Sequence, residues 1–129
     1  MSSWQKCGME DKIVEALGEV EKNGAHAFGI SYVTAYQIAM ILDAKHPDLL
    51  AELDMQLGGE GQPRSMARYV ANNLSRAIGA NANFPIEGAF LSTRNVDEIS
   101  FNAPGGTQVL STAAGNYNLS MFRLRITSQ

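Results

Sequence analysis

The sequence RSMARYVANNLSRAI, residues 64–78, places apolar and polar side chains on opposite faces of a predicted helix. Its apolar residues recur three and four positions apart, which is the spacing of one helical face. They are Met66, Tyr69, Val70, Leu74, Ala77 and Ile78. A polar stripe, in which each residue follows the last by four positions, consists of Arg64, Arg68, Asn72 and Arg76. We expect the apolar face to join the core and the polar stripe to be exposed to solvent.

The polar stripe has the chemistry of a DNA-binding surface. Arginine pairs with guanine, asparagine pairs with adenine, and both bind phosphates, so a helix with this face can read the major groove. The candidate DNA-binding residues of this helix are therefore Arg64, Arg68, Asn72 and Arg76. Two alternatives stay open. The arginines solvate an exposed face, or they pair with acidic residues in the first half of the chain.

Helical patterns precede this stretch. The clearest helix start is at Thr34, a good N-cap that is followed three residues later by Gln37, as in a capping box. The patterns predict helices from Met9 to about Glu21, from Ala35 to about Lys45 and from Pro47 to Leu57. The helical part thus covers residues 9–79, with Gly79 closing the last helix, and residues 1–8 are predicted to be a flexible arm.

Strand patterns follow the last helix. The predicted strands are Ile86–Thr93, Glu98–Asn102, Gln108–Thr112 and Tyr117–Thr127. In the final strand, Arg123 and Arg125 alternate with apolar residues and share one face, and both are added to the candidate DNA-binding residues. Helices followed by a strand part over 86–127 predict an α+β fold, with 1–129 as a single domain. Three or four helices would then pack on an antiparallel sheet or hairpin.

The chain resembles a winged-helix domain over about Thr34 to Thr127. The resemblance rests on the helix TAYQIAMIL (34–42), the helix RSMARYVANNLSRAI (64–78) and the strands that follow them. The resemblance implies that the later helix enters the major groove of DNA and that the hairpin touches the DNA backbone. It implies the same groove contacts, Arg64, Arg68, Asn72 and Arg76. The chain departs from the family pattern in two places. The segment between the two helices is long and carries a predicted helix, and the strand part is longer than one wing.

Charge is divided unevenly along the 129 residues, whose net charge is −3. Residues 1–63 carry four lysines and ten acidic residues, whereas residues 64–129 carry six arginines and three acidic residues. Such asymmetry indicates an anionic partner. It equally allows the two halves to attract one another, within a monomer or across a dimer.

Composition narrows the class of protein. No apolar run is long enough to cross a bilayer, and the N-terminus lacks the apolar region of a secretory signal, so we expect a cytoplasmic protein without a membrane partner. The single cysteine, Cys7, cannot form an internal disulfide. His26 and His46 lack the spacing of metal ligands, and we expect no metal and no cofactor.

Carboxylates in the strand part leave an enzymatic alternative open. Glu87, Asp97 and Glu98 are of the type that acts as general acid and base, but no spacing pairs them at one site. We therefore assign no catalytic residue and favour a non-catalytic, DNA-binding protein. The alternative is a protein-interaction module or a small-ligand-binding homo-oligomer. Tyr117–Thr127, expected at an edge of the sheet, favours a homodimer.

Overall fold

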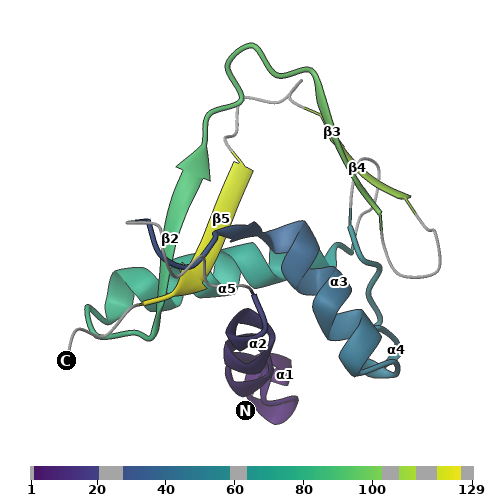
Figure 1. Ribbon diagram of the computed structural model, residues 1–129. Helices are drawn as coiled ribbons and strands as arrows, with labels where there is room; N and C mark the ends of the chain where they lie inside the picture. Colours follow the sequence, from purple (N-terminus) through teal and green to yellow (C-terminus); the bar gives the residue numbers. More distant parts are fainter. Residues whose placement is uncertain (1, 21–27, 59–63, 103–107, 113–118, 126–129) are drawn as a thin grey trace.

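The structure is a computed structural model that describes residues 2–20, 28–58, 64–102, 108–112 and 119–125 (Figure 1). Its helices are α1 (Ser3–Lys6), α2 (Met9–Gly18), α3 (Ala35–Lys45), α4 (Leu49–Leu53) and α5 (Met66–Ala80). Its strands are β1 (Val33–Thr34), β2 (Ile86–Leu91), β3 (Glu98–Asn102), β4 (Gln108–Thr112) and β5 (Leu119–Leu124). Apart from β1, the strands follow the helices, which confirms the predicted α+β class.

Three strands form an antiparallel sheet in the order β1-β5-β2. Phe122 of β5 lies opposite both Val33 of β1 and Gly88 of β2, so the last strand of the chain is the central strand. The expectation that this strand lies at an edge is wrong. The reason is that β1, which is only two residues long and has no strand pattern of its own, pairs with the side of β5 that β2 leaves free.

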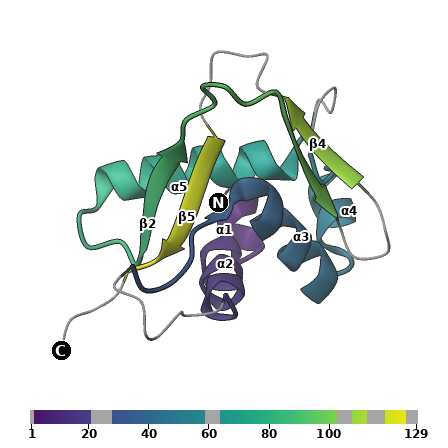
Figure 2. The same cartoon turned by 45° about the horizontal axis from the view of Figure 1, so that its top comes forward.

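The strands β3 and β4 form a separate antiparallel pair, in which Glu98 lies opposite Thr112. This pair stands apart from β2 and β5 and lies on the side of α3 (Figures 1 and 2). The ring of Phe101 in β3 stacks on that of Tyr36 in α3, with 5.4 Å between the ring centroids. Phe101 also packs against the buried Met40. The segments that connect β3 to β4 and β4 to β5, residues 103–107 and 113–118, lie outside the described residues.

Side-chain caps define the starts of α3 and α5. The Thr34 hydroxyl accepts a hydrogen bond from the backbone nitrogen of Gln37 at 3.2 Å. The side-chain oxygen of Gln37 accepts one from the backbone nitrogen of Thr34 at 2.7 Å. The predicted capping box of α3 is therefore confirmed. At α5 the Ser65 hydroxyl accepts a hydrogen bond from the backbone nitrogen of Arg68 at 3.0 Å. This helix therefore begins after Ser65 rather than at Arg64.

Three helix ends differ from the prediction. The helix α2 ends at Gly18 instead of about Glu21. The helix α4 is shorter than Pro47–Leu57, because Asp54 adopts a left-handed backbone with a φ of 54° and ends it. In α5, Gly79 has helical backbone and the helix continues to Ala80, where the extended Asn81 ends it.

Residues 3–6 form the helix α1, so the prediction of a flexible arm is wrong for the described residues 2–8. Ser2 and Gln5 form a capping box at the start of α1. Trp4 is 7% exposed, and its ring meets the Tyr69 ring edge-on at 5.3 Å. Its indole nitrogen donates a hydrogen bond to Glu10 at 3.4 Å. Burial of this one large side chain packs α1 against α2 and α5. The sequence did not indicate this packing, because a single tryptophan produces no periodic pattern.

The main hydrophobic core of the described residues receives side chains from the helices and from the three-stranded sheet. Its largest fully buried members are Phe122, Met9, Ile13, Leu17, Ile38, Leu42, Met66, Leu74, Ile86 and Val70. The sheet covers one side of α5, while α2 and α3 pack beside it (Figures 1 and 2). Within the described residues, no helix has the length and apolar character that crossing a membrane requires.

Candidate nucleic-acid interface

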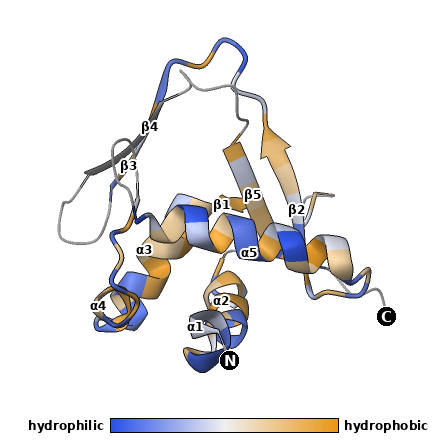
Figure 3. Ribbon diagram, turned by 180° about the vertical axis from the view of Figure 1, so that it is seen from behind, coloured by the Kyte–Doolittle hydropathy of each residue, from blue (hydrophilic) through white to orange (hydrophobic). Residues whose placement is uncertain are grey.

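The inner face of α5 is the predicted apolar face. Met66, Val70 and Leu74 are at most 1% exposed. The strand β2 approaches this helix closely at Gly88, where an added Cβ atom would lie 3.3 Å from the Phe122 ring and 3.5 Å from Cδ1 of Ile78. Because the sheet and the core occupy this side, the orientation of α5 is fixed and its other side faces solvent (Figure 3).

The outer face of α5 presents Arg68, Asn72 and Arg76, all of which are exposed. The prediction that this part of the stripe faces solvent is confirmed. Ser75 is also exposed on this face and was not among the predicted residues. The sequence of α5 contains no acidic residue. The ion pairs and hydrogen bonds found among the described residues involve none of the side chains of Arg68, Asn72 and Arg76.

Arg64 lies outside the helix and has a different environment. Its guanidinium donates to the Leu53 carbonyl oxygen at 3.1 Å and to the Asp54 carbonyl oxygen, and it lies 3.8 Å from the Asp54 carboxylate. These contacts satisfy carbonyl groups at the end of α4, where a cation is also favoured by the helix dipole. The alternative that arginines pair with the acidic first half therefore describes Arg64, whereas Arg68 and Arg76 make no such pair with the described acids.

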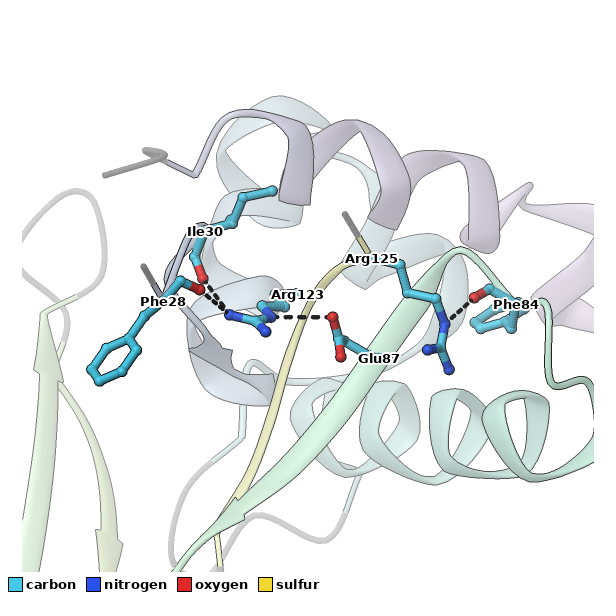
Figure 4. A network of polar contacts seen from close by, with 6 residues as sticks. All are labelled: Phe28, Ile30, Phe84, Glu87, Arg123 and Arg125. Carbon is cyan, nitrogen blue, oxygen red and sulfur yellow. Dashed lines mark hydrogen bonds and ion pairs between the residues drawn. The ribbon is translucent and has the colours of Figure 1, made fainter. Parts of the chain in front are cut away.

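Arg123 is bound within the fold rather than free at its surface (Figure 4). Its side chain is 19% exposed and contacts the Glu87 carboxylate at 3.2 Å. It also donates to the carbonyl oxygens of Phe28 at 2.8 Å and Ile30 at 3.0 Å, and it lies over the Tyr32 ring at 4.4 Å from the centroid. Arg123 thus joins β2, β5 and the segment that leads into β1.

Arg125 makes a similar internal contact, donating to the Phe84 carbonyl oxygen at 2.8 Å (Figure 4). Phe122 points into the core, so alternation along β5 places Arg123 and Arg125 on the opposite face of the sheet. The outer face of α5 lies on the far side of the core from that face. The structure therefore brings Arg68, Asn72 and Arg76 together and leaves Arg123 and Arg125 on a separate surface.

The other residues considered from the sequence do not converge. Glu87 pairs with Arg123, while Asp97 and Glu98 are exposed. Among the described residues, no cluster of three or more His, Cys, Asp or Glu side chains suits a metal ion. His26 lies outside the described residues.

An open hollow beside α4 mixes opposite charges. Its lining consists of Lys12, Lys45, His46, Pro47, Asp48, Leu49 and Glu52. The buried Nε2 atom of His46 has no hydrogen-bond partner among the described residues. Two lysines facing two acids give no preference for a ligand of either charge, so this hollow suggests no ligand class.

An exposed aromatic residue, Phe90, was not singled out from the sequence. It is 68% exposed, although it shares a strand face with the buried Ile86. The alternation of β2 predicts a core-facing residue at this position. The ring is exposed because it lies beyond the edge of the helices that cover this face of the strand. The position of that edge cannot be read from the sequence pattern.

No protein-family model matches this chain, and comparisons with curated proteins and with solved structures found no significant match.

Proposed function

We propose that this chain binds duplex DNA by placing the outer face of α5 in the major groove. The observation that carries the proposal is the exposure of Arg68, Asn72 and Arg76 together, without partners among the described residues, on a helix that has no acidic residue. A helix of 15 residues is about 22 Å long, and the major groove is wide enough to accept it. The proposal is compatible with the expected cytoplasmic location in a cell whose DNA lies in the cytoplasm.

The positions around the helix suggest different roles for the three residues. Arg68 and Asn72 are separated by about 40° around the helix axis and by one turn along it, so both side chains can reach base edges in one groove. Arg76 is about 80° from Arg68, toward one flank of the exposed face, where a groove wall would lie. Arg68 and Asn72 then contact guanine and adenine on neighbouring base pairs, and Arg76 contacts a phosphate.

The order of elements supports the same proposal. In winged-helix domains, which the sequence resembles, the later of two core helices is followed by a pair of antiparallel strands. Here α5 is followed by β2, which pairs with β5. The two departures noted in the sequence correspond to α4, which lies between α3 and α5, and to β3 and β4, which lie between β2 and β5.

A titration of duplex DNA tests the proposal. A labelled mixed-sequence duplex, followed by fluorescence anisotropy at low salt, should be bound by the native chain and bound more weakly by Arg68→Ala and Arg76→Ala. Lys6→Ala, which removes one positive charge from the exposed Lys6 on α1, is the matched control and should bind as the native chain does. Absence of binding by the folded native chain at low salt would show that the proposal is wrong.

Self-association is a second candidate, favoured by the position of β2. Within the described residues β2 is paired on one side alone, and it carries the exposed Phe90 and Leu91. Such an edge invites pairing with another strand. A second copy of the chain would make a homodimer, which light scattering would detect as a mass above the 13.9 kDa of the monomer.

A further inference from the structure

We propose that Phe90 forms an apolar contact with the same DNA duplex, beside α5. The inference rests on the proposed function and adds a residue of a different chemical type from a different element. Phe90 and Phe28, at 68% and 78% exposed, are the two most exposed large apolar side chains among the described residues. Phe28 precedes β1 on the Arg123 side of the sheet, whereas Phe90 belongs to the sheet face that covers α5.

The register of β2 places the Phe90 ring just beyond the edge of α5. Ile86, Gly88 and Phe90 point to one face of the strand. Ile86 is completely buried, and Gly88 lies against Ile78 of α5. Two further residues advance the strand by about 7 Å, which is more than the radius of a helix with its side chains. The chain therefore leaves the core between Gly88 and Phe90, and the ring projects past the flank of α5.

The identity of this flank follows from helical geometry. Ile78 lies at one border of the buried face of α5. Going around the helix from Ile78 away from the core, the next side chains are Ala71 and Ser75, and Arg68 follows. Ser75 and Arg68 are exposed. Phe90 therefore lies on the flank that carries Ser75 and Arg68, and Arg76 lies on the other. Figure 3 shows β2 rising from behind α5, whose polar side faces the viewer.

The partner of this ring is an apolar group of the DNA. Duplex DNA exposes thymine methyl groups in the major groove and deoxyribose carbons along the groove walls, and phenylalanine is among the side chains that contact the thymine methyl. An aromatic ring neutralises no phosphate and releases no counterion, so it should add nothing to the slope of affinity against salt concentration. The arginines of α5 contribute in the opposite manner. The arginines of α5 can thus contact phosphates along a groove wall, while the Phe90 ring beside them contacts the apolar carbons of the same wall.

Paired substitutions in β2 test this assignment. Phe90→Ala should weaken binding of a mixed-sequence duplex by about threefold to tenfold, the scale of burying part of an aromatic ring. Because the ring is exposed, the melting temperature should not change, and the slope of affinity against salt should equal that of the native chain. Leu91→Ala is the matched control, since Leu91 is 40% exposed and points to the other face of the strand. It should bind within about twofold of the native chain.

The outcomes separate this inference from the proposed function. If the native chain binds no DNA, both are wrong. If it binds and Phe90→Ala binds equally well, or if Leu91→Ala weakens binding as much, the Phe90 contact alone is wrong. A lower oligomeric mass of Phe90→Ala with unchanged affinity would assign the ring to self-association and overturn the DNA contact. Replacing thymine by deoxyuridine removes the methyl groups and distinguishes the two DNA groups. If Phe90 contacts a thymine methyl, the native and Phe90→Ala chains bind the substituted duplex equally, whereas a sugar contact keeps the difference between them.

Discussion

Leu74 is the residue that best tests the orientation of α5. Its side chain is completely buried between this helix and the rest of the core. Leu74→Ala should lower the free energy of unfolding by about 2–5 kcal/mol, because it removes buried methyl groups and leaves a cavity. Chemical denaturation measures this change. Ser75→Ala, at the adjacent exposed position, is the control and should change stability by less than about 0.5 kcal/mol. A loss below about 1 kcal/mol for Leu74→Ala would mean that the inner face is wrongly assigned.

Arg123 should be important for stability rather than for DNA binding. Lysine cannot reproduce the several directed hydrogen bonds that its guanidinium makes to Glu87, Phe28 and Ile30. Arg123→Lys should therefore destabilise the fold by about 1–3 kcal/mol while the affinity of the folded chain for DNA stays unchanged. Denaturation and anisotropy on one preparation measure both quantities. If Arg123→Lys has native stability but binds DNA poorly, Arg123 belongs to the DNA-binding surface and this prediction is wrong.

Single residues also show what the sequence can and cannot predict. The spacing of Arg68, Asn72 and Arg76 against an apolar face correctly predicted their exposure. The same reasoning added Arg123 and Arg125 to the candidate surface, but the structure places them on another face. Their hydrogen-bond partners, such as Phe28 and Phe84, are far away in the sequence, and local periodicity holds no information about contacts of that range.

Among the elements, α3 has the clearest local sequence signal for its start. Its capping box was predicted from Thr34 and Gln37 and is present with both hydrogen bonds. Thr34→Ala should lower the free energy of unfolding by about 1 kcal/mol, since backbone donors at the helix start are left without their partner. Thr34→Ser keeps the hydroxyl and serves as the control in thermal melts. Equal stability of the Ala and native chains would show that the cap contributes nothing to the fold.

The short elements α1 and β1 show where local patterns fail. A helix of four residues and a strand of two residues are too short to display periodicity, so neither was predicted. Their positions depend on tertiary contacts, namely the burial of Trp4 for α1 and the pairing with β5 for β1. The central place of β5 has the same origin, because the order of strands along the chain does not determine their order in a sheet.

The single tryptophan makes the packing of α1 measurable. Trp4 is nearly buried against Tyr69, so its fluorescence should be blue-shifted in the native chain and should shift to the red in the same denaturant range as the loss of helical circular dichroism. The physical reason is that α1 shares the core with α2 and α5 and unfolds with them. Tryptophan emission that is already red in the native chain would contradict the docking of α1.

For the molecule as a whole, charge arrangement matters more than net charge. The chain carries a net charge of −3, which by itself opposes binding to DNA. Every arginine, however, lies in residues 64–129, and three of the six are held by contacts within the fold. Arg68 and Arg76 remain exposed on a helix that lacks acidic residues. In the proposed complex, local attraction at this face has to overcome the repulsion between an acidic chain and a polyanion, so short-range contacts have to supply the affinity.

The salt dependence of DNA affinity tests this account most directly. Affinity of the native chain for a mixed-sequence duplex, measured by anisotropy over a series of salt concentrations, should fall linearly on logarithmic axes, because phosphate contacts release counterions. The double variant Arg68→Ala, Arg76→Ala should bind more weakly and with a shallower slope, smaller by about one unit for each phosphate that an arginine no longer neutralises. The account predicts both changes with native stability retained. Equal affinity and equal slope for the two folded proteins would contradict it.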